Sequence, residues 1–229
     1  MWVEINAVSL PPGTVKEWDI SPKPPYEMQV RVCVLNCKDI PMMDVEGTCD
    51  AFFRGFFDTK EDVQETDTHF RNQDGKPDFE YRLLYDVSYP KKNSKFTLQG
   101  YDLDFFTGNE LIGESSIELK QLMEDVSMIK SPINLNKRYY EEVLKPQNKN
   151  LQLEFDKNDD TKIWLHLMNK KEGKMVKHGS VRVQIDVVPK THADKNPVGK
   201  ARDNPNHSPQ LPQPEGRMEM SLNPVKMFN

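Results

Sequence analysis

Runs of alternating apolar and polar residues, separated by turn signals, constrain the fold of this chain more than any other feature. The runs span residues 27–35, 50–57, 63–71, 79–87, 96–102, 111–119, 162–168 and 181–188. Alternation with a period of two is typical of half-buried strands, because successive side chains point to opposite faces of a sheet. Strands that recur every 8–12 residues or so indicate an antiparallel sandwich or barrel. We therefore expect an all-β fold, an eight-stranded antiparallel β-sandwich.

The remaining stretches divide the chain into three parts. Residues 1–26 hold a strand-like run and a Pro-rich linker, and residues 27–189 form the expected sandwich domain. Within that domain, residues 120–130 have the apolar spacing of one short helix, and residues 131–161 form a polar insertion that we expect at the surface. Residues 190–229 are rich in proline and poor in aromatic residues. Such a composition predicts an extended or flexible tail.

Charge and cysteine content narrow the class of protein. The formal net charge of −5 argues against a general nucleic-acid binder. Cys33, Cys37 and Cys49 are odd in number and lack zinc-ligand spacing, which predicts free thiols in a reducing compartment. Cys33 and Cys37 lie four apart in one strand, so we expect both on one face. No run reaches the roughly 18 apolar residues of a membrane span, so we expect peripheral membrane contact or a span outside this sequence.

The stretch Y-D-L-D-F-F-T-G-N-E, residues 101–110, is the most unusual in the chain. It gathers Asp102, Asp104 and Glu110 at the end of an apolar strand, with Phe105 and Phe106 between them. A carboxylate-rich loop is typically compensated by a hard cation with oxygen ligands, which usually means calcium.

A second acidic loop joins the first two strands of the sandwich. Asp44 and Asp50 bracket a glycine there. If both loops leave the same end of the sandwich, five carboxylates converge, and one to three calcium ions would neutralise their repulsion. A pair of unconnected, solvated acidic turns is the alternative.

Three segments resemble a known module. M-D-V-E-G-T-C-D-A-F-F (residues 43–53), P-D-F-E-Y-R-L-L-Y-D-V (residues 77–87) and Y-D-L-D-F-F-T-G-N-E-L-I-G (residues 101–113) resemble the C2 domain, the calcium-binding sandwich of protein kinase C and synaptotagmin. The stretches E-T-D-T-H-F-R-N-Q-D-G-K, K-N-P-V-G-K-A-R-D-N-P-N and L-N-P-V-K-M further resemble the C-terminal region of ferlins. Ferlins are multi-C2, tail-anchored proteins of calcium-triggered membrane fusion and repair.

The resemblance implies a set of metal ligands. Ca²⁺ would be bound by five carboxylates and by two backbone carbonyls: Asp44, Asp50, Asp102, Asp104 and Glu110, with Met43 and Leu103. Glu110 stands where the family usually has Asp, and the extra methylene moves the carboxylate. The outermost ion would then bind more weakly or not at all.

The rings and lysines suggest membrane contact. Val45, with Met42 or Met43, and Phe105 and Phe106 would insert beside the ions, although Phe105 could instead fold back onto the sandwich edge. Lys91, Lys92 and Lys95 form a basic turn that would contact lipid headgroups if it faced the same membrane. A solvated hairpin turn is the alternative for these lysines.

Two hypotheses of function follow, and neither is an enzyme, because no nucleophilic or phosphate-binding arrangement can be argued from the residues. The first is a calcium-dependent phospholipid-binding module of a ferlin-like protein of membrane fusion and vesicle trafficking. It would act at the cytoplasmic face of anionic membranes, with other domains of its protein or fusion-machinery proteins as further partners and no nucleic acid. The second is a calcium-independent protein-interaction or scaffolding C2 domain.

Overall fold

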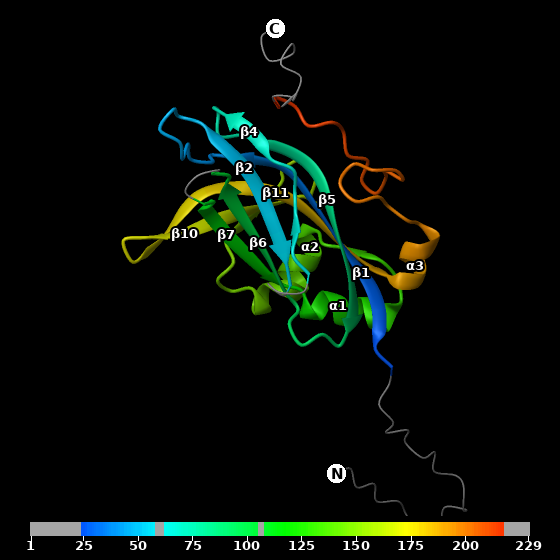
Figure 1. The fold of residues 1–229 in the computed structure, drawn as a ribbon. Coiled ribbons are helices and arrows are strands. Elements are labelled where there is room, and N and C mark those ends of the chain that lie inside the picture. Colours follow the sequence, from blue (N-terminus) through cyan, green and yellow to red (C-terminus); the bar gives the residue numbers. More distant parts are fainter. Residues whose placement is uncertain (1–23, 58–61, 105–107, 218–229) are drawn as a thin grey trace, which may run out of the picture.

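A computed structural model describes residues 24–57, 62–104 and 108–217 (Figure 1). The N-terminal strand-like run, Phe105 and Phe106 lie outside these ranges. The described strands are β1 (Tyr26–Lys38), β2 (Cys49–Phe56), β3 (Gln64–Glu65), β4 (His69–Asn72), β5 (Asp78–Tyr89), β6 (Lys95–Asp102), β7 (Glu110–Glu118), β8 (Ile133–Asn134), β9 (Leu153–Phe155), β10 (Ile163–Lys171) and β11 (Lys174–Pro189). The predicted all-β class is confirmed.

Helices are few and short. They are α1 (Lys120–Ile129), α2 (Lys137–Tyr139), a π-helical turn η1 (Tyr140–Leu144), a 3-10 turn η2 (Lys145–Gln147) and α3 (Lys190–Lys195). Within the described ranges, none of them is long and apolar enough to cross a membrane. The helix expected at residues 120–130 is confirmed as α1.

Hydrogen bonding connects eight strands in the order β3-β2-β6-β7-β10-β11-β1-β5, all in antiparallel pairs. Three short strands attach to this path at its sides, β4 on β2, β8 on β11 and β9 on β10. The path doubles over into two layers, and Met168 of β10 and Glu114 of β7 pair where it turns. The expected eight-stranded sandwich therefore describes the main path, to which the structure adds three short strands.

The two layers bury one continuous core. Strands of both layers contribute, for example Val32 from β1, Phe53 from β2, Leu98 from β6 and Val183 from β11. These side chains occupy the inward positions of period-two strands, so burial of apolar surface selects the register. The alternation seen in the sequence is thus the pattern that closes the sandwich.

One expectation about the cysteines was wrong. The register of β1 against β11 shifts between Val34 and Cys37, so an extra residue changes which face the chain presents. Cys37 consequently joins the main core, whereas Cys33 packs outside it with Leu35 and Leu211. All three cysteines are free and buried, and burial raises the pKa of the Cys33 thiol to about 12.

The insertion at residues 131–161 is anchored more deeply than its polar composition predicts. Leu135, Tyr140 and Leu144 reach the main core. Asn148 is buried as well; its Nδ2 donates to the carbonyls of Glu118 (3.1 Å) and Leu144 (3.0 Å). A few apolar side chains and one buried amide therefore fix this excursion to the sandwich.

We expected an extended or flexible tail after Pro189, and up to residue 217 the chain is fixed against the sandwich, beginning with the short helix α3. Residues 190–217 cross the outer face of the layer that contains β1 and β5, and Figure 1 shows them running from α3 along that side of the molecule. Arg82 of β5 is fully buried beneath this segment. Its guanidinium donates to the carbonyls of Gly199 (2.9 Å), His207 (3.0 Å) and Pro209 (2.6 Å).

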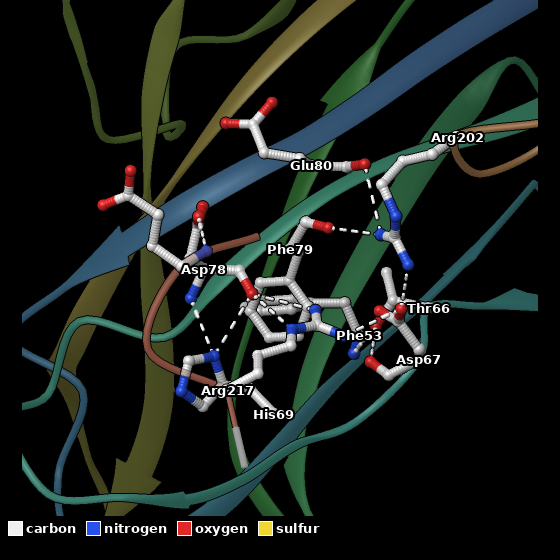
Figure 2. Close-up of polar contacts among 10 residues, drawn as sticks. Phe53, Thr66, Asp67, His69, Asp78, Phe79, Glu80, Arg202 and Arg217 are labelled. Atoms are coloured by element: carbon white, nitrogen blue, oxygen red, sulfur yellow. Dashed lines mark hydrogen bonds and ion pairs between the residues drawn. The ribbon is translucent and has the colours of Figure 1, made fainter. Parts of the chain in front are cut away.

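The same segment closes the gap between the two ends of the strand path. Ala201 exchanges two main-chain hydrogen bonds with Arg82, and the Arg202 guanidinium donates to the carbonyls of Phe79 and Glu80. Arg202 and Arg217 both form ion pairs with Asp67, which lies between β3 and β4 (Figure 2). Bare strand edges are a hazard for aggregation, and these contacts cover the edge of β5.

Candidate calcium site at the loop end

The two acidic loops leave the same end of the sandwich. β1 ends at Lys38 and β2 begins at Cys49, while β6 ends at Asp102. β2 and β6 are antiparallel, with Ala51 opposite Asp102, so the start of β2, where the loop of residues 39–48 ends, lies beside the end of β6, where the second loop begins. We call this the loop end. The condition for convergence of the carboxylates is therefore met.

Asp102 and Asp50 are linked directly. The backbone N–H of Asp50 donates to Asp102 Oδ1 (2.6 Å), and the N–H of Leu103 donates to the carbonyl of Asp50 (2.9 Å). Asp50 Oδ1 in turn accepts from the N–H of Arg71 (2.6 Å). Main-chain N–H groups thus orient the carboxylates of Asp102 and Asp50, two of the five expected carboxylate ligands.

Asp44 sits in a tight turn of the first loop. Its carbonyl accepts from the N–H of Gly47 (3.0 Å), which has a positive φ of 75° that glycine adopts without strain. Asp44 Oδ2 accepts from the hydroxyl of Thr48 (2.7 Å). Val45, the next residue, is fully exposed at the tip of the turn.

The electrostatics of Asp102 distinguish it from an ordinary surface carboxylate. Its side chain is buried, with the residue 4% exposed. The pKa of Asp102 is raised to about 6, mainly by burial and also by the neighbouring carboxylates of Asp44 and Asp50, against the opposing effect of the Asp50 N–H. The pKa of the adjacent Cys49 thiol is also raised, first by burial and then by Asp102. The site thus holds negative charge at an energetic cost that a cation would relieve.

Asp104 and Glu110 lie on either side of residues 105–107, which the structure does not describe. Asp104 is half-buried, and its N–H lies 3.4 Å from Asn109 Oδ1. Glu110 is exposed and stands opposite Asp102 in the β6–β7 register. No cluster of three or more potential metal-binding side chains is already assembled within the described ranges. The donor set has the chemistry that calcium prefers.

Of the apolar and basic residues expected to contact the membrane, only some lie beside the acidic loops. Met42 and Met43 pack against the core, so Val45 is the projecting apolar residue of the first loop. Lys91 and Lys92 lie in the turn between β5 and β6, and Lys95 is the first residue of β6, all at the end of the sandwich opposite the loop end. The lysines therefore do not adjoin the acidic loops.

Two contributors to the site were missed by sequence reasoning. The Thr48 hydroxyl binds Asp44, and a donor at this spacing inside the loop could have been noticed. The N–H of Arg71 donates to Asp50 because β4 pairs with β2. No local sequence pattern predicts this contact.

The architecture, with two acidic loops at one end of an eight-strand sandwich, defines the C2 class. Residues 28–133 match the family model of the C2 domain. Over nearly its full length the chain is homologous to ferlin family members. It is 26% identical to "Myoferlin" of Homo sapiens over 260 residues, covering 99% of this chain and 12% of that protein. It is 24% identical to "Ferlin 1" of Toxoplasma gondii over 192 residues, covering 82% of this chain and 12% of that protein.

The chain therefore spans only about an eighth of the length of these relatives. Among solved structures it is similar to a C2 domain of plant Extended Synaptotagmin 1. That match has a TM-score of 0.46 and 15% identity, and it covers 73% of this chain and 98% of the other.

Proposed function

We propose that the loop end binds calcium and thereby attaches the domain to anionic phospholipid membranes. The observation that carries the proposal is Asp102, a buried carboxylate placed beside those of Asp44 and Asp50. Holding the Asp102 carboxylate charged in this position without a cation is unfavourable, whereas oxygen ligands of this type are those that calcium takes. Membership of residues 28–133 in a family that binds phospholipid membranes supports the choice of partner.

In this proposal the ligands are the carboxylates of the two loops, Asp44, Asp50, Asp102 and Asp104, with Glu110 as an outer ligand. Bound calcium would supply positive charge at a surface that is otherwise acidic. The chain's own contribution is orientation, because the N–H groups of Asp50 and Arg71 hold the Asp102 and Asp50 carboxylates in place. The carbonyls of Met43 and Leu103 remain proposed ligands.

Val45 supplies the apolar part of the proposed contact. It is fully exposed at the tip of the first loop, where it makes no contribution to the core. Burial of a valine side chain in the headgroup–acyl boundary contributes about 1.5 kcal/mol, which suits reversible attachment. Phe105 and Phe106 remain expected insertions of the second loop. The resemblance to ferlins further supports the proposal that the protein acts in membrane fusion and vesicle trafficking at the cytoplasmic face.

Calorimetric titration of the chain with calcium tests the first step. We expect heat of binding for the wild type and none for the double variant Asp102→Asn with Asp104→Asn. Asp194→Asn with Asp203→Asn, two exposed carboxylates of the 190–217 segment, is the matched control. Absence of calcium heat in the wild type, or equal heat in the loop variant, would contradict the proposal.

Co-sedimentation with phosphatidylserine vesicles, in calcium and in chelator, tests the second step. The second candidate function, a calcium-independent protein-interaction domain, is favoured by the lack of a preassembled ligand cluster among the described residues and by the exposed Glu110. That function predicts sedimentation that calcium does not increase. The loop-end proposal predicts an increase that the double variant abolishes.

A further inference from the structure

The hairpin that joins β10 to β11 carries an unusual concentration of basic and apolar side chains. Residues 170–177 read K-K-E-G-K-M-V-K. We call them the basic hairpin. Four lysines against Glu172 give this stretch a net charge of +3, in a chain whose net charge is −5. All eight residues are exposed, including Met175 at 60% and Val176 at 39%.

The four lysines are not neutralised by carboxylates of the described chain. Over the described part of the chain, Lys170, Lys171, Lys174 and Lys177 take part in no ion pair. Lys171 and Lys174 stand directly opposite each other across the hairpin. Like charges in that position are destabilising. The hairpin therefore retains an arrangement that an external anionic surface would improve.

The base of the hairpin is rigidly placed. Asn169 Nδ2 donates to the carbonyl of Leu111 (2.6 Å), and His178 Nδ1 lies 3.0 Å from the carbonyl of Ile112. The two residues at the turn, Glu172 and Gly173, both have positive φ. This is the pattern of a type I′ turn, which is common in two-residue β-hairpins. A well-formed hairpin thus presents the lysines, and Figure 1 shows it projecting from the sandwich on the side away from residues 190–217.

The hairpin also projects at the loop end. Lys38, the last residue of β1, pairs with Ser180, so residues 174–179 extend beyond the point where β1 stops. A Cβ at Gly179 would lie 2.7 Å from the carbonyl oxygen of Asp39, which places the hairpin base against the start of the first acidic loop. Any planar surface that meets the loop end is therefore approached by the basic hairpin as well.

We propose that the basic hairpin is a calcium-independent docking element for the anionic surface of a phospholipid bilayer. Pairing and alternation place Lys170 and Met175 on one face and Lys171, Lys174 and Val176 on the other. A protein partner that covers one face would leave the second exposed. Entry of the tip into a headgroup layer covers both faces, with the apolar side chains below and the ammonium groups among lipid phosphates.

Vesicle binding in chelator isolates this element from the proposed calcium site. The wild type should bind phosphatidylcholine vesicles that contain phosphatidylserine, and should bind pure phosphatidylcholine at least about tenfold more weakly. Salt should weaken the binding, because the lysines are exposed. The variant with Lys170, Lys171, Lys174 and Lys177 each changed to Gln should lose at least about tenfold in affinity, since each lysine near the surface contributes about fivefold.

A matched control makes the same charge change elsewhere. Lys130, Lys137, Lys145 and Lys149, exposed lysines that follow α1, are changed to Gln, and this variant should bind as the wild type does. A Met175→Cys variant with an environment-sensitive fluorophore should show a blue shift on anionic vesicles. Circular dichroism confirms that each variant is folded.

Four outcomes would overturn the proposal. These are no wild-type binding in chelator, equal binding by the hairpin variant, equal loss in the control, and no blue shift at position 175, which would instead suit a protein partner. The result in calcium is separate. A calcium-dependent increment that vanishes in the Asp102→Asn, Asp104→Asn variant concerns only the acidic loops, so either proposal can fail alone.

Discussion

Asp102 combines structural and candidate functional roles in one side chain. It accepts the N–H that begins the pairing of β2 with β6, and it lies closest to the core of the carboxylates at the loop end. Its elevated pKa arises mainly from burial, which no sequence pattern reveals. The acidic composition of the loop was visible in the sequence, whereas the cost of that composition became visible only in the structure.

The first prediction concerns the stability of the cation-free protein. The pKa of Asp102 is about 6 in the folded state and about 3.9 in an unfolded chain, so between these values the folded state binds more protons. The free energy of unfolding should therefore fall as pH rises through that window. Asp102→Asn keeps an oxygen acceptor for Asp50 and should stabilise the protein by about 2 kcal/mol at neutral pH in chelator.

Urea denaturation at about pH 7.5 and about pH 4.5 measures this effect, and the stabilisation should shrink at the lower value. Asp203→Asn, an exposed carboxylate, serves as the control. A destabilised Asp102→Asn protein at neutral pH would show that the charge on Asp102 supports the fold. The proposed calcium binding should weaken below about pH 6, because protons then compete for the same oxygen atoms.

At the scale of elements, the strands were predictable and the C-terminal segment was not. Period-two alternation is a local signal, and burial inside one sandwich enforces it. Residues 190–217 have few apolar residues, so their composition predicts no stable structure. They are held instead by arginine–carbonyl hydrogen bonds to residues more than 100 positions away, such as Arg82 to Gly199. The bulge that separates Cys33 from Cys37 was equally hidden, because strand pairing determines it.

The second prediction tests the attachment of that segment. Arg82→Ala removes a fully buried side chain that donates to three carbonyls and leaves a cavity, so we expect destabilisation of about 3 kcal/mol or more. Proteolysis should then cut within residues 190–217 before the sandwich unfolds. Arg138→Ala is the control, because its ion pair with Glu142 is highly exposed and should contribute less than about 0.5 kcal/mol. Equal protease resistance of wild type and Arg82→Ala would refute the anchoring role.

On the scale of the whole molecule, the sandwich separates two groups of lysines. Residues 170–177 lie at the loop end, whereas Lys91, Lys92 and Lys95 lie at the opposite end, where the chain passes from β5 to β6. The eight residues of β6 alone separate the two ends by about 26 Å. Each group could be read from the sequence as a basic turn, but only strand order and direction show which one adjoins the acidic loops.

The third prediction follows from this polarity. Changing Lys91, Lys92 and Lys95 to Gln should leave binding to phosphatidylserine vesicles within about twofold of the wild type, because these lysines lie well over a Debye length from the loop end. Sedimentation in calcium measures it. A loss of tenfold or more would mean that the domain lies flat on the membrane or meets it with its opposite end.

The contacts of Ala201, Arg202 and Arg217 with the edge of β5 affect how this domain can associate with other chains. The edge strand β5 already has its outward carbonyls occupied near Asp78, Phe79 and Glu80, and the opposite edge is the two-residue strand β3. Along residues 78–82 of β5, another chain therefore cannot add a strand to this sheet, because residues 190–217 already occupy the main-chain groups. At this part of the edge, a partner would have to recognise side chains and loop tips rather than main chain.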